Sequence, residues 1–138
     1  MDKVFTVDQA NKMLPLVRRI VEDAVRDYIR WQDRVREFEL ASVRSTVEHP
    51  DPIAAELEQD VQRLAESIDS YVHEIAQLGV QMKSIDSGIV DFPAELAGRP
   101  ILLCWQLGED SIEFWHEAGG GFAGRQPLTS RMIPQFTF

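Results

Sequence analysis

The stretch WHEAGGGFAGRQP, residues 115–127, holds the side chains of this sequence that are best suited to chemistry. His116 and Glu117 can transfer protons or bind metals, and Arg125 can hold a carboxylate or phosphate through paired hydrogen bonds. Together with Asp91, these residues are the candidates for a small enzyme or an anion-binding or metal-binding protein. The glycine-rich backbone before Arg125 could also bind a small anion. The residue types do not identify a substrate, so enzymatic activity is left open.

The glycines in this stretch do not make a nucleotide-binding loop. Gly119 and Gly124 have the spacing of G-x-x-x-x-G-K-[ST], but Arg125 stands in place of the lysine and Gln126 in place of the hydroxyl residue. Pro127 opposes the helix whose amide groups would point at the phosphates. We therefore predict no nucleotide, and the sequence indicates no other cofactor.

Metal binding is a second hypothesis for the same region. A zinc motif H-E-x-x-H begun at His116 would need a second histidine at position 120, which is glycine. Asp91, Cys104, His116 and Glu117 could still converge in a sheet and supply metal ligands. The competing interpretation is structural, with Cys104 as a small buried side chain and His116 as a hydrogen-bonded, half-buried one.

Alternation along a strand predicts where the charged residues should lie. Consecutive strand residues face opposite sides of a sheet, so His116 and Glu117 should be separated. If the site is functional, Asp91, His116 and Arg125 should meet in one solvent-accessible hollow. If it is structural, Arg125 should form a buried ion pair with Asp91 or Glu117, while Asp91 could also pair with Arg99. We favour the structural outcome.

Residues 1–79 are predicted to form an antiparallel helical hairpin with a short N-terminal helix. Thr6 and Gln9 have the spacing of a capping box, and Pro15 should then interrupt the helix and begin a new one. The turn STVEHPDP separates two stripes, and Gly79 stands where a helix ends. The first stripe, at heptad-like spacing, comprises Leu14, Val17, Val21, Ala24, Tyr28, Trp31, Val35 and Phe38, and the second comprises Ile53, Leu57, Val61, Leu64, Ile68, Tyr71, Ile75 and Leu78.

Residues 80–138 are predicted to form a β-meander and a C-terminal tail. The segments GIVDFP, RPILLCWQL and SIEFWHE are short and rich in β-branched and aromatic residues, and their brief connections require antiparallel pairing. Residues 101–107 are largely apolar on both faces, which predicts a central, covered strand. Pro93 followed by AELAG indicates a single helical turn closed by Gly98. The fold class is therefore α+β, a long helical hairpin packed on a small antiparallel sheet in one domain, residues 1–138.

The helices carry more apolar residues than a single seam needs, which predicts a homodimer formed through the helices. These extra positions, beside the main stripes, are Leu16, Ile20, Val25, Ile29, Ala65, Val72 and Ala76. Two helices bury one apolar stripe each against the other. The extra apolar positions would stay exposed in a monomer, so they favour pairing with a second copy or a partner. The leading functional hypothesis is a non-enzymatic interaction module.

Charge and composition narrow the classes of partner. The net charge is −9, and residues 51–98 hold two Lys or Arg against ten Asp or Glu, so nucleic-acid binding is not expected. The sequence has no apolar run long enough for a membrane span and no signal-peptide pattern. One cysteine excludes an intrachain disulfide and is typical of a reducing compartment, so we expect a cytoplasmic protein.

The order of several short motifs resembles a known family. FTVDQANKMLP precedes the hairpin, and GIVDFP, LCWQLGE, FWHE and GFAGRQPL follow it. This arrangement is similar to a prokaryotic family of unknown function, the domain of unknown function 2203 family, over nearly the whole chain. The resemblance implies a small cytoplasmic prokaryotic protein, and it implies no reaction, cofactor or catalytic residue.

Overall fold

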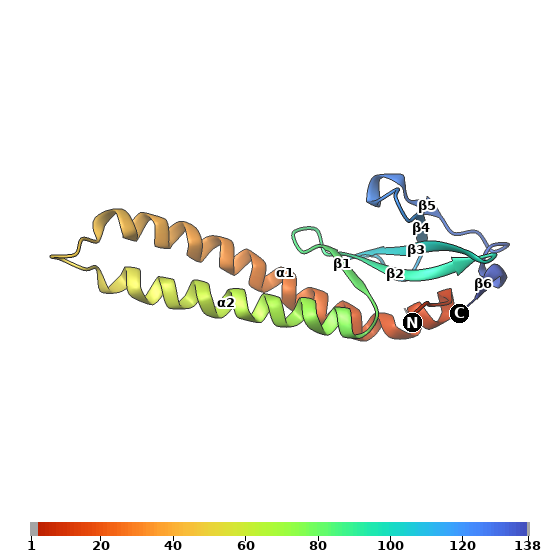
Figure 1. Cartoon of the computed structure of the whole chain (residues 1–138), viewed down its shortest axis with the longest axis horizontal. Helices are drawn as coiled ribbons and strands as arrows, with labels where there is room; N and C mark the ends of the chain where they lie inside the picture. The colour runs from red at the N-terminus through yellow and green to blue at the C-terminus, as the bar shows by residue number, and fades with distance from the viewer. Residues whose placement is uncertain (1–2, 138) are drawn as a thin grey trace.

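The computed structural model describes residues 3–137, which form a long helical hairpin with an antiparallel sheet against one end (Figure 1). The helices are α1, Val7–Arg44, and α2, Pro52–Gln77. The sheet lies beside the part of the hairpin nearest the N-terminus of α1, and the remainder of the hairpin extends beyond it (Figure 1). The predicted α+β fold is confirmed.

Helix α1 begins at the predicted capping box. The Thr6 hydroxyl accepts a hydrogen bond from the Gln9 backbone amide at 3.1 Å, and the Gln9 side chain accepts one from the Thr6 amide at 3.0 Å. These two bonds satisfy amide donors that have no partner inside the helix. The start of the helix is therefore set by its own sequence.

The predicted break at Pro15 is wrong, because α1 continues through it as a single helix. Ala10, Leu14 and Val17 around it are buried, with at most 2% of their surface exposed. Burying one Leu or Val side chain contributes about 1.5–3 kcal/mol, so this packing outweighs the roughly 3 kcal/mol that an interior proline costs. Pro15 itself is on the exposed side of the helix.

Helix α2 is delimited by local signals at both ends. The Asp51 side chain accepts a hydrogen bond from the Ile53 amide at 2.9 Å, and Pro52 occupies the first turn, where its missing amide hydrogen has no cost. At the other end Gly79 has a φ of 84°, which follows the last helical residues as predicted.

The sheet consists of β1 (Gln81–Ser84), β2 (Ile89–Leu96), β3 (Arg99–Gln106), β4 (Phe114–Glu117) and β5 (Gln126–Pro127). The strands lie in this order and pair antiparallel. A short strand β6 (Phe136–Thr137) pairs with the end of β2, and two single turns of 3-10 helix, Phe122–Gly124 and Ile133–Gln135, interrupt the C-terminal segment. The predicted central strand is β3.

The helical turn predicted around Pro93 is absent, because β2 runs through this residue to Leu96. A two-residue turn at Ala97 and Gly98, with φ angles of 51° and 80°, leads directly into β3. The Pro93 carbonyl accepts a hydrogen bond from the Phe5 amide at 2.7 Å. Since the nitrogen and carbonyl of one strand residue point to the same side, the proline nitrogen points away from β3, and no bond of that ladder is lost.

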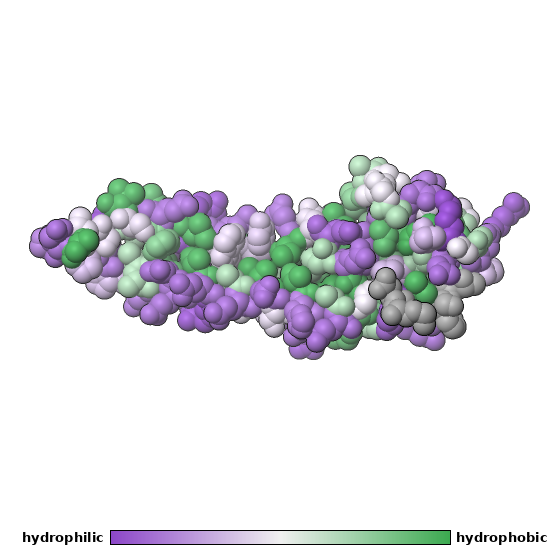
Figure 2. Space-filling model, viewed as in Figure 1, coloured by the Kyte–Doolittle hydropathy of each residue, from purple (hydrophilic) through white to green (hydrophobic). Residues whose placement is uncertain are grey.

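One face of the sheet packs against helix α1, and the other faces away from it. Val90, Phe92, Leu103 and Trp105 are fully buried in the main core with apolar residues of α1. The alternate residues of the same strands, among them Asp91, face the other side. On the hairpin, hydrophobic residues continue well beyond the sheet (Figure 2).

Candidate functional site

Strand register brings three of the predicted site residues together on the outer face of the sheet. Asp91 on β2 is directly opposite Cys104 on β3, and His116 on β4 is opposite Leu102. Leu102 and Cys104 are two residues apart, so they share a face. One ligand atom from each of Asp91, Cys104 and His116 lies within 4.8 Å of the others, and all three residues are buried.

The His116 ring is held by hydrogen-bond acceptors on both of its nitrogens. Nδ1 lies 2.7 Å from the backbone carbonyl oxygen of Glu117, and Nε2 lies 3.0 Å from Oδ1 of Asp91. A carbonyl oxygen can only accept, so Nδ1 carries a hydrogen. Nε2 and the Asp91 carboxylate then face each other, and a positive species, either a proton or a metal cation, is needed between them.

The environment of Cys104 favours the protonated thiol over the thiolate. Burial, and secondly the negative charge of Asp91, raise the pKa of the Cys104 thiol to about 11, although Arg125 acts in the opposite direction. At neutral pH the sulfur is therefore protonated unless a cation binds it. Burial of Cys104 agrees with its interpretation as a small buried side chain.

A hollow adjoins the cluster on its outer side. Its volume is about 360 Å³, and its walls include Asp91 and His116 together with Lys83, Leu102, Gly119 and Phe122. The glycine-rich segment therefore lies across the outer face of the sheet as a wall of the hollow. Cys104 is not among the residues that line the hollow.

Arg125 does not join the hollow, and it fixes the segment that covers it. Its guanidinium donates two hydrogen bonds to the Glu109 carboxylate, at 3.1 and 2.6 Å. It also lies over the rings of Phe114 and Phe122, at 3.9 and 4.2 Å from their centroids. The predicted ion pair with Asp91 or Glu117 is wrong in its partner, which is Glu109.

Glu117 lies on the opposite face from His116, as strand alternation predicts. Its side chain is exposed and forms an ion pair with Arg99. Arg99 is therefore unavailable to Asp91, contrary to one of the predicted pairings, and Asp91 pairs with His116 instead. Glu117 contributes only its backbone carbonyl to the cluster.

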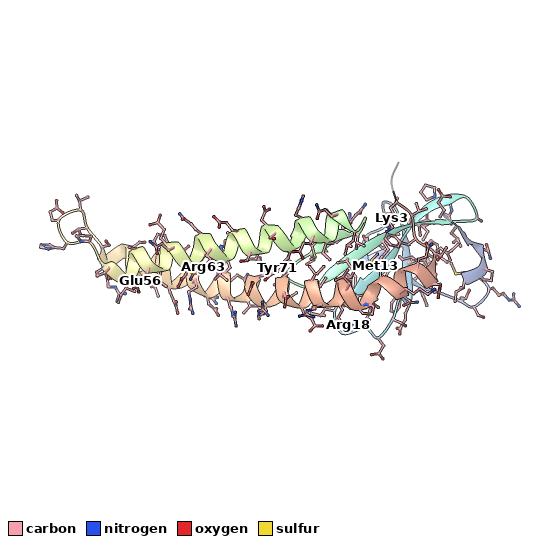
Figure 3. The ribbon with its side chains drawn as sticks, turned by 90° about the horizontal axis from the view of Figure 1, so that it is seen from below. Lys3, Met13, Arg18, Glu56, Arg63 and Tyr71 are labelled. Atoms are coloured by element: carbon pink, nitrogen blue, oxygen red, sulfur yellow. The ribbon has the colours of Figure 1, made fainter. Side chains whose placement is uncertain are left out.

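A polar contact that the sequence did not reveal joins the two helices. Asp27 is 5% exposed, and its carboxylate accepts hydrogen bonds from the Tyr71 hydroxyl at 3.1 Å and from Arg26 Nε at 3.2 Å. Tyr71 lies where the two helices meet (Figure 3). A buried aspartate on an apolar stripe gives no clear signal in the sequence, because acidic residues also occur throughout the exposed surface of α1.

Beyond this contact, an apolar groove runs between the helices. It has a volume of about 270 Å³ and is lined mainly by Tyr28, Trp31, Ile68 and Val72, with Ile85 of the β1–β2 turn at one end. Among residues 3–137, Trp31 Nε1 is buried without a hydrogen-bond partner. A helix able to cross a membrane does not occur in this part of the chain, since neither helix is sufficiently apolar over the required length.

These features define a small α+β protein in which a helical hairpin supports an antiparallel sheet with a buried Asp–Cys–His cluster. The chain belongs to the family described as "Uncharacterized conserved protein (DUF2203)", which matches residues 3–128. The resemblance based on the sequence motifs is thereby confirmed. Comparisons with curated proteins and with solved structures gave no match.

Proposed function

We propose that this protein is a self-associating interaction module, in which the distal parts of two hairpins pack together as a four-helix bundle. One observation carries the proposal. Between Tyr28 and Val72, all of which the structure describes, the buried apolar residues are Ala41 and Ala54 alone. The large stripe residues of this region are half-buried or, in the case of Ile53, exposed, and Val72 beside the stripe is half-buried too. The half-buried stripe residues are Tyr28, Trp31, Val35, Phe38, Leu57, Val61, Leu64, Ile68 and Tyr71.

The reason is that this region lacks a third layer. Near its base, the hairpin has the sheet against one face, and most stripe residues there are buried, with Tyr71 and Leu78 partly buried. Farther along, the groove of Tyr28, Trp31, Ile68 and Val72 has Ile85 of the β1–β2 turn as its one lining residue from outside the two helices. Since two helices complete only one seam, a second hairpin on this face would bury what the sheet leaves open.

Charge favours one arrangement of the two copies. Residues 15–44 hold seven Arg against six acidic residues, whereas residues 53–78 hold one Arg against six. Placing α2 beside α2 of a second copy would bring two acidic helices together, which is unfavourable. We therefore propose a two-fold dimer in which α1 of each copy lies beside α2 of the other.

Light scattering of the full chain, over a range of micromolar concentrations, tests the proposal. The expected mass is twice 15.7 kDa. Ala65→Glu places a charge in the groove region on an exposed α2 position and should shift the mass to that of the monomer. Ala and Glu have similar helix propensities, so α2 should remain folded by circular dichroism.

Ser70→Glu is the matched control. Ser70 is also exposed on α2, and five residues correspond to a rotation of about 140° around the helix, so the added charge lies away from the groove. This variant should remain dimeric. A monomeric wild-type protein at every concentration, or equal masses for the two variants, would contradict the proposed interface.

A further inference from the structure

We infer that Asp91, Cys104 and His116 form a binding site for one divalent metal ion of the zinc type. The cluster supplies one oxygen, one sulfur and one nitrogen, with the ligand atoms within 4.8 Å of one another. All three are among the ligands that zinc uses in proteins. The thiol favours zinc or a similar transition metal over magnesium or calcium, which prefer oxygen ligands.

The His116 ring is already in the orientation that a metal ligand requires. Its Nδ1 hydrogen is donated to the Glu117 carbonyl at 2.7 Å, which leaves the Nε2 lone pair directed toward Asp91. Metal-binding histidines are usually fixed by this kind of bond from the second ring nitrogen to a carbonyl or carboxylate. The backbone of β4 thus selects both the tautomer and the ring position.

Charge balance favours a divalent cation at this position. Asp91 is 1% exposed, and within residues 3–137 its carboxylate has no Lys or Arg as a salt-bridge partner. A buried carboxylate is costly unless a positive species lies beside it, and His116 supplies one only when its ring is protonated. With Cys104 bound as thiolate and His116 neutral, one divalent ion cancels the two negative charges, so the buried centre carries no net charge.

Binding an ion requires the three ligand atoms, now within 4.8 Å of one another, to adjust their spacing. Tetrahedral zinc with bond lengths of about 2.0–2.3 Å places its ligand atoms about 3.3–3.6 Å apart. Nε2 and Oδ1 are now 3.0 Å apart, close to a hydrogen-bond distance, so these two atoms would separate slightly as the ion entered. Cys104 lies directly across the ladder from Asp91 and can approach by rotation of its side chain.

Three protein ligands leave a fourth coordination position free. Asp91 and His116 both line the hollow of about 360 Å³, so water or an oxygen atom of a small molecule would take that position. This arrangement corresponds to the open zinc sites of enzymes rather than to closed structural sites, which have four protein ligands. The Arg125–Glu109 pair keeps the covering segment in place beside it.

Metal titration of the chelator-treated, full-length protein tests the site. Zn²⁺ should bind with one equivalent per chain, measured by isothermal titration and by metal analysis after gel filtration. Co²⁺ in place of zinc should produce the near-ultraviolet charge-transfer absorption of a cobalt–thiolate bond. Cys104→Ser should abolish that absorption and weaken Zn²⁺ binding by more than about 100-fold, because losing even an outer hydrogen-bond partner of a ligand typically costs 10- to 100-fold.

His73→Gln is the matched control for His116→Gln. His73 is exposed on α2, far from the sheet cluster in sequence and on a different element, so its replacement should leave the affinity unchanged. His116→Gln should abolish stoichiometric binding, with folding checked by circular dichroism. If that variant does not fold, Cys104→Ser, which changes one atom of a small side chain, decides the question alone.

Absence of stoichiometric Zn²⁺ and Co²⁺ binding by the folded wild-type protein would overturn the inference. Equal affinity in wild type and Cys104→Ser, or a cobalt complex without thiolate absorption, would do the same. Light scattering of the same samples measures self-association independently of metal binding. The two results can differ because the proposed dimer interface lies on the helices, whereas the three metal ligands lie on the sheet.

Discussion

The base and the distal half of the hairpin have similar apolar stripes, yet only the base is fully packed. Leu14, Val17, Val21 and Ile75 are at most 2% exposed near the sheet. Stripe residues farther along, such as Leu64, remain half-buried. The periodicity of a helix therefore predicts which side faces inward, whereas a third layer determines how completely that side is buried.

The largest expected effect comes from removing core volume at the base. Leu14→Ala should lower the free energy of unfolding by about 2–5 kcal/mol, because Leu14 is 2% exposed and its loss leaves a cavity. Leu64→Ala should lower it by roughly 1 kcal/mol in the monomeric Ala65→Glu background, since half of the burial is missing there. Urea unfolding of both variants measures the difference. Equal losses would show that the two halves are packed alike.

The next effect concerns the segment over the hollow. Arg125→Ala should destabilise the protein by about 2–3 kcal/mol, because Glu109, whose side chain is 17% exposed, would lose its paired hydrogen bonds. Arg99→Ala removes an ion pair whose side chains are about half exposed, and it should change stability by less than about 1 kcal/mol. Thermal unfolding distinguishes them. A smaller loss for Arg125→Ala than for Arg99→Ala would refute the role given to the Glu109 pair.

The helical elements of this fold were predictable because their signals are local. The capping box at Thr6 and the glycine after α2 act within a few residues, and the alternation of His116 and Glu117 needs only a strand. Pro15 and Pro93 were misinterpreted because their surroundings, not their own preferences, decide the outcome. Packing of neighbouring residues retains the helix at Pro15. The strand continues through Pro93 because the proline nitrogen points away from β3, so the ladder loses no bond there.

The cluster was only partly predictable for a related reason. Asp91, Cys104 and His116 could be named as candidate ligands, but Asp91 lies opposite Cys104 only because the turn at Ala97 has two residues. The sequence predicts the end of a helical turn at this point, so it does not specify the register. The ion pair of Glu109 with Arg125 could not be predicted. The segment GED indicates a turn, and a turn does not specify which basic residue lies beside its glutamate.

A smaller effect is expected at the boundary between the two halves. Tyr71→Phe removes the hydroxyl that bonds to Asp27, and it should lower stability by about 1–2 kcal/mol because the buried carboxylate loses one of its donors. Tyr28→Phe removes the other tyrosine hydroxyl of the chain and retains the stacking of that ring on Trp31, so its effect should be close to zero. Urea unfolding in parallel gives the comparison. A larger loss for Tyr28→Phe would place the important polar contact elsewhere.

The smallest effect is a dependence of that contact on alkaline pH. Burial, and then the hydrogen bond to Asp27, raise the pKa of the Tyr71 hydroxyl above its ordinary value of about 10. A group whose pKa is higher in the folded state contributes its full stability below the unfolded pKa and loses it as the pH rises through the folded pKa. The stability difference between wild type and Tyr71→Phe should therefore be constant from pH 7 to 9 and shrink above about pH 10. Other groups also titrate there, including Cys104, whose pKa is about 11, but they are present in both proteins and cancel in the difference. Unfolding midpoints at half-unit pH intervals measure it, and a difference that grows with pH would mean that the Tyr71 hydroxyl does not donate to Asp27.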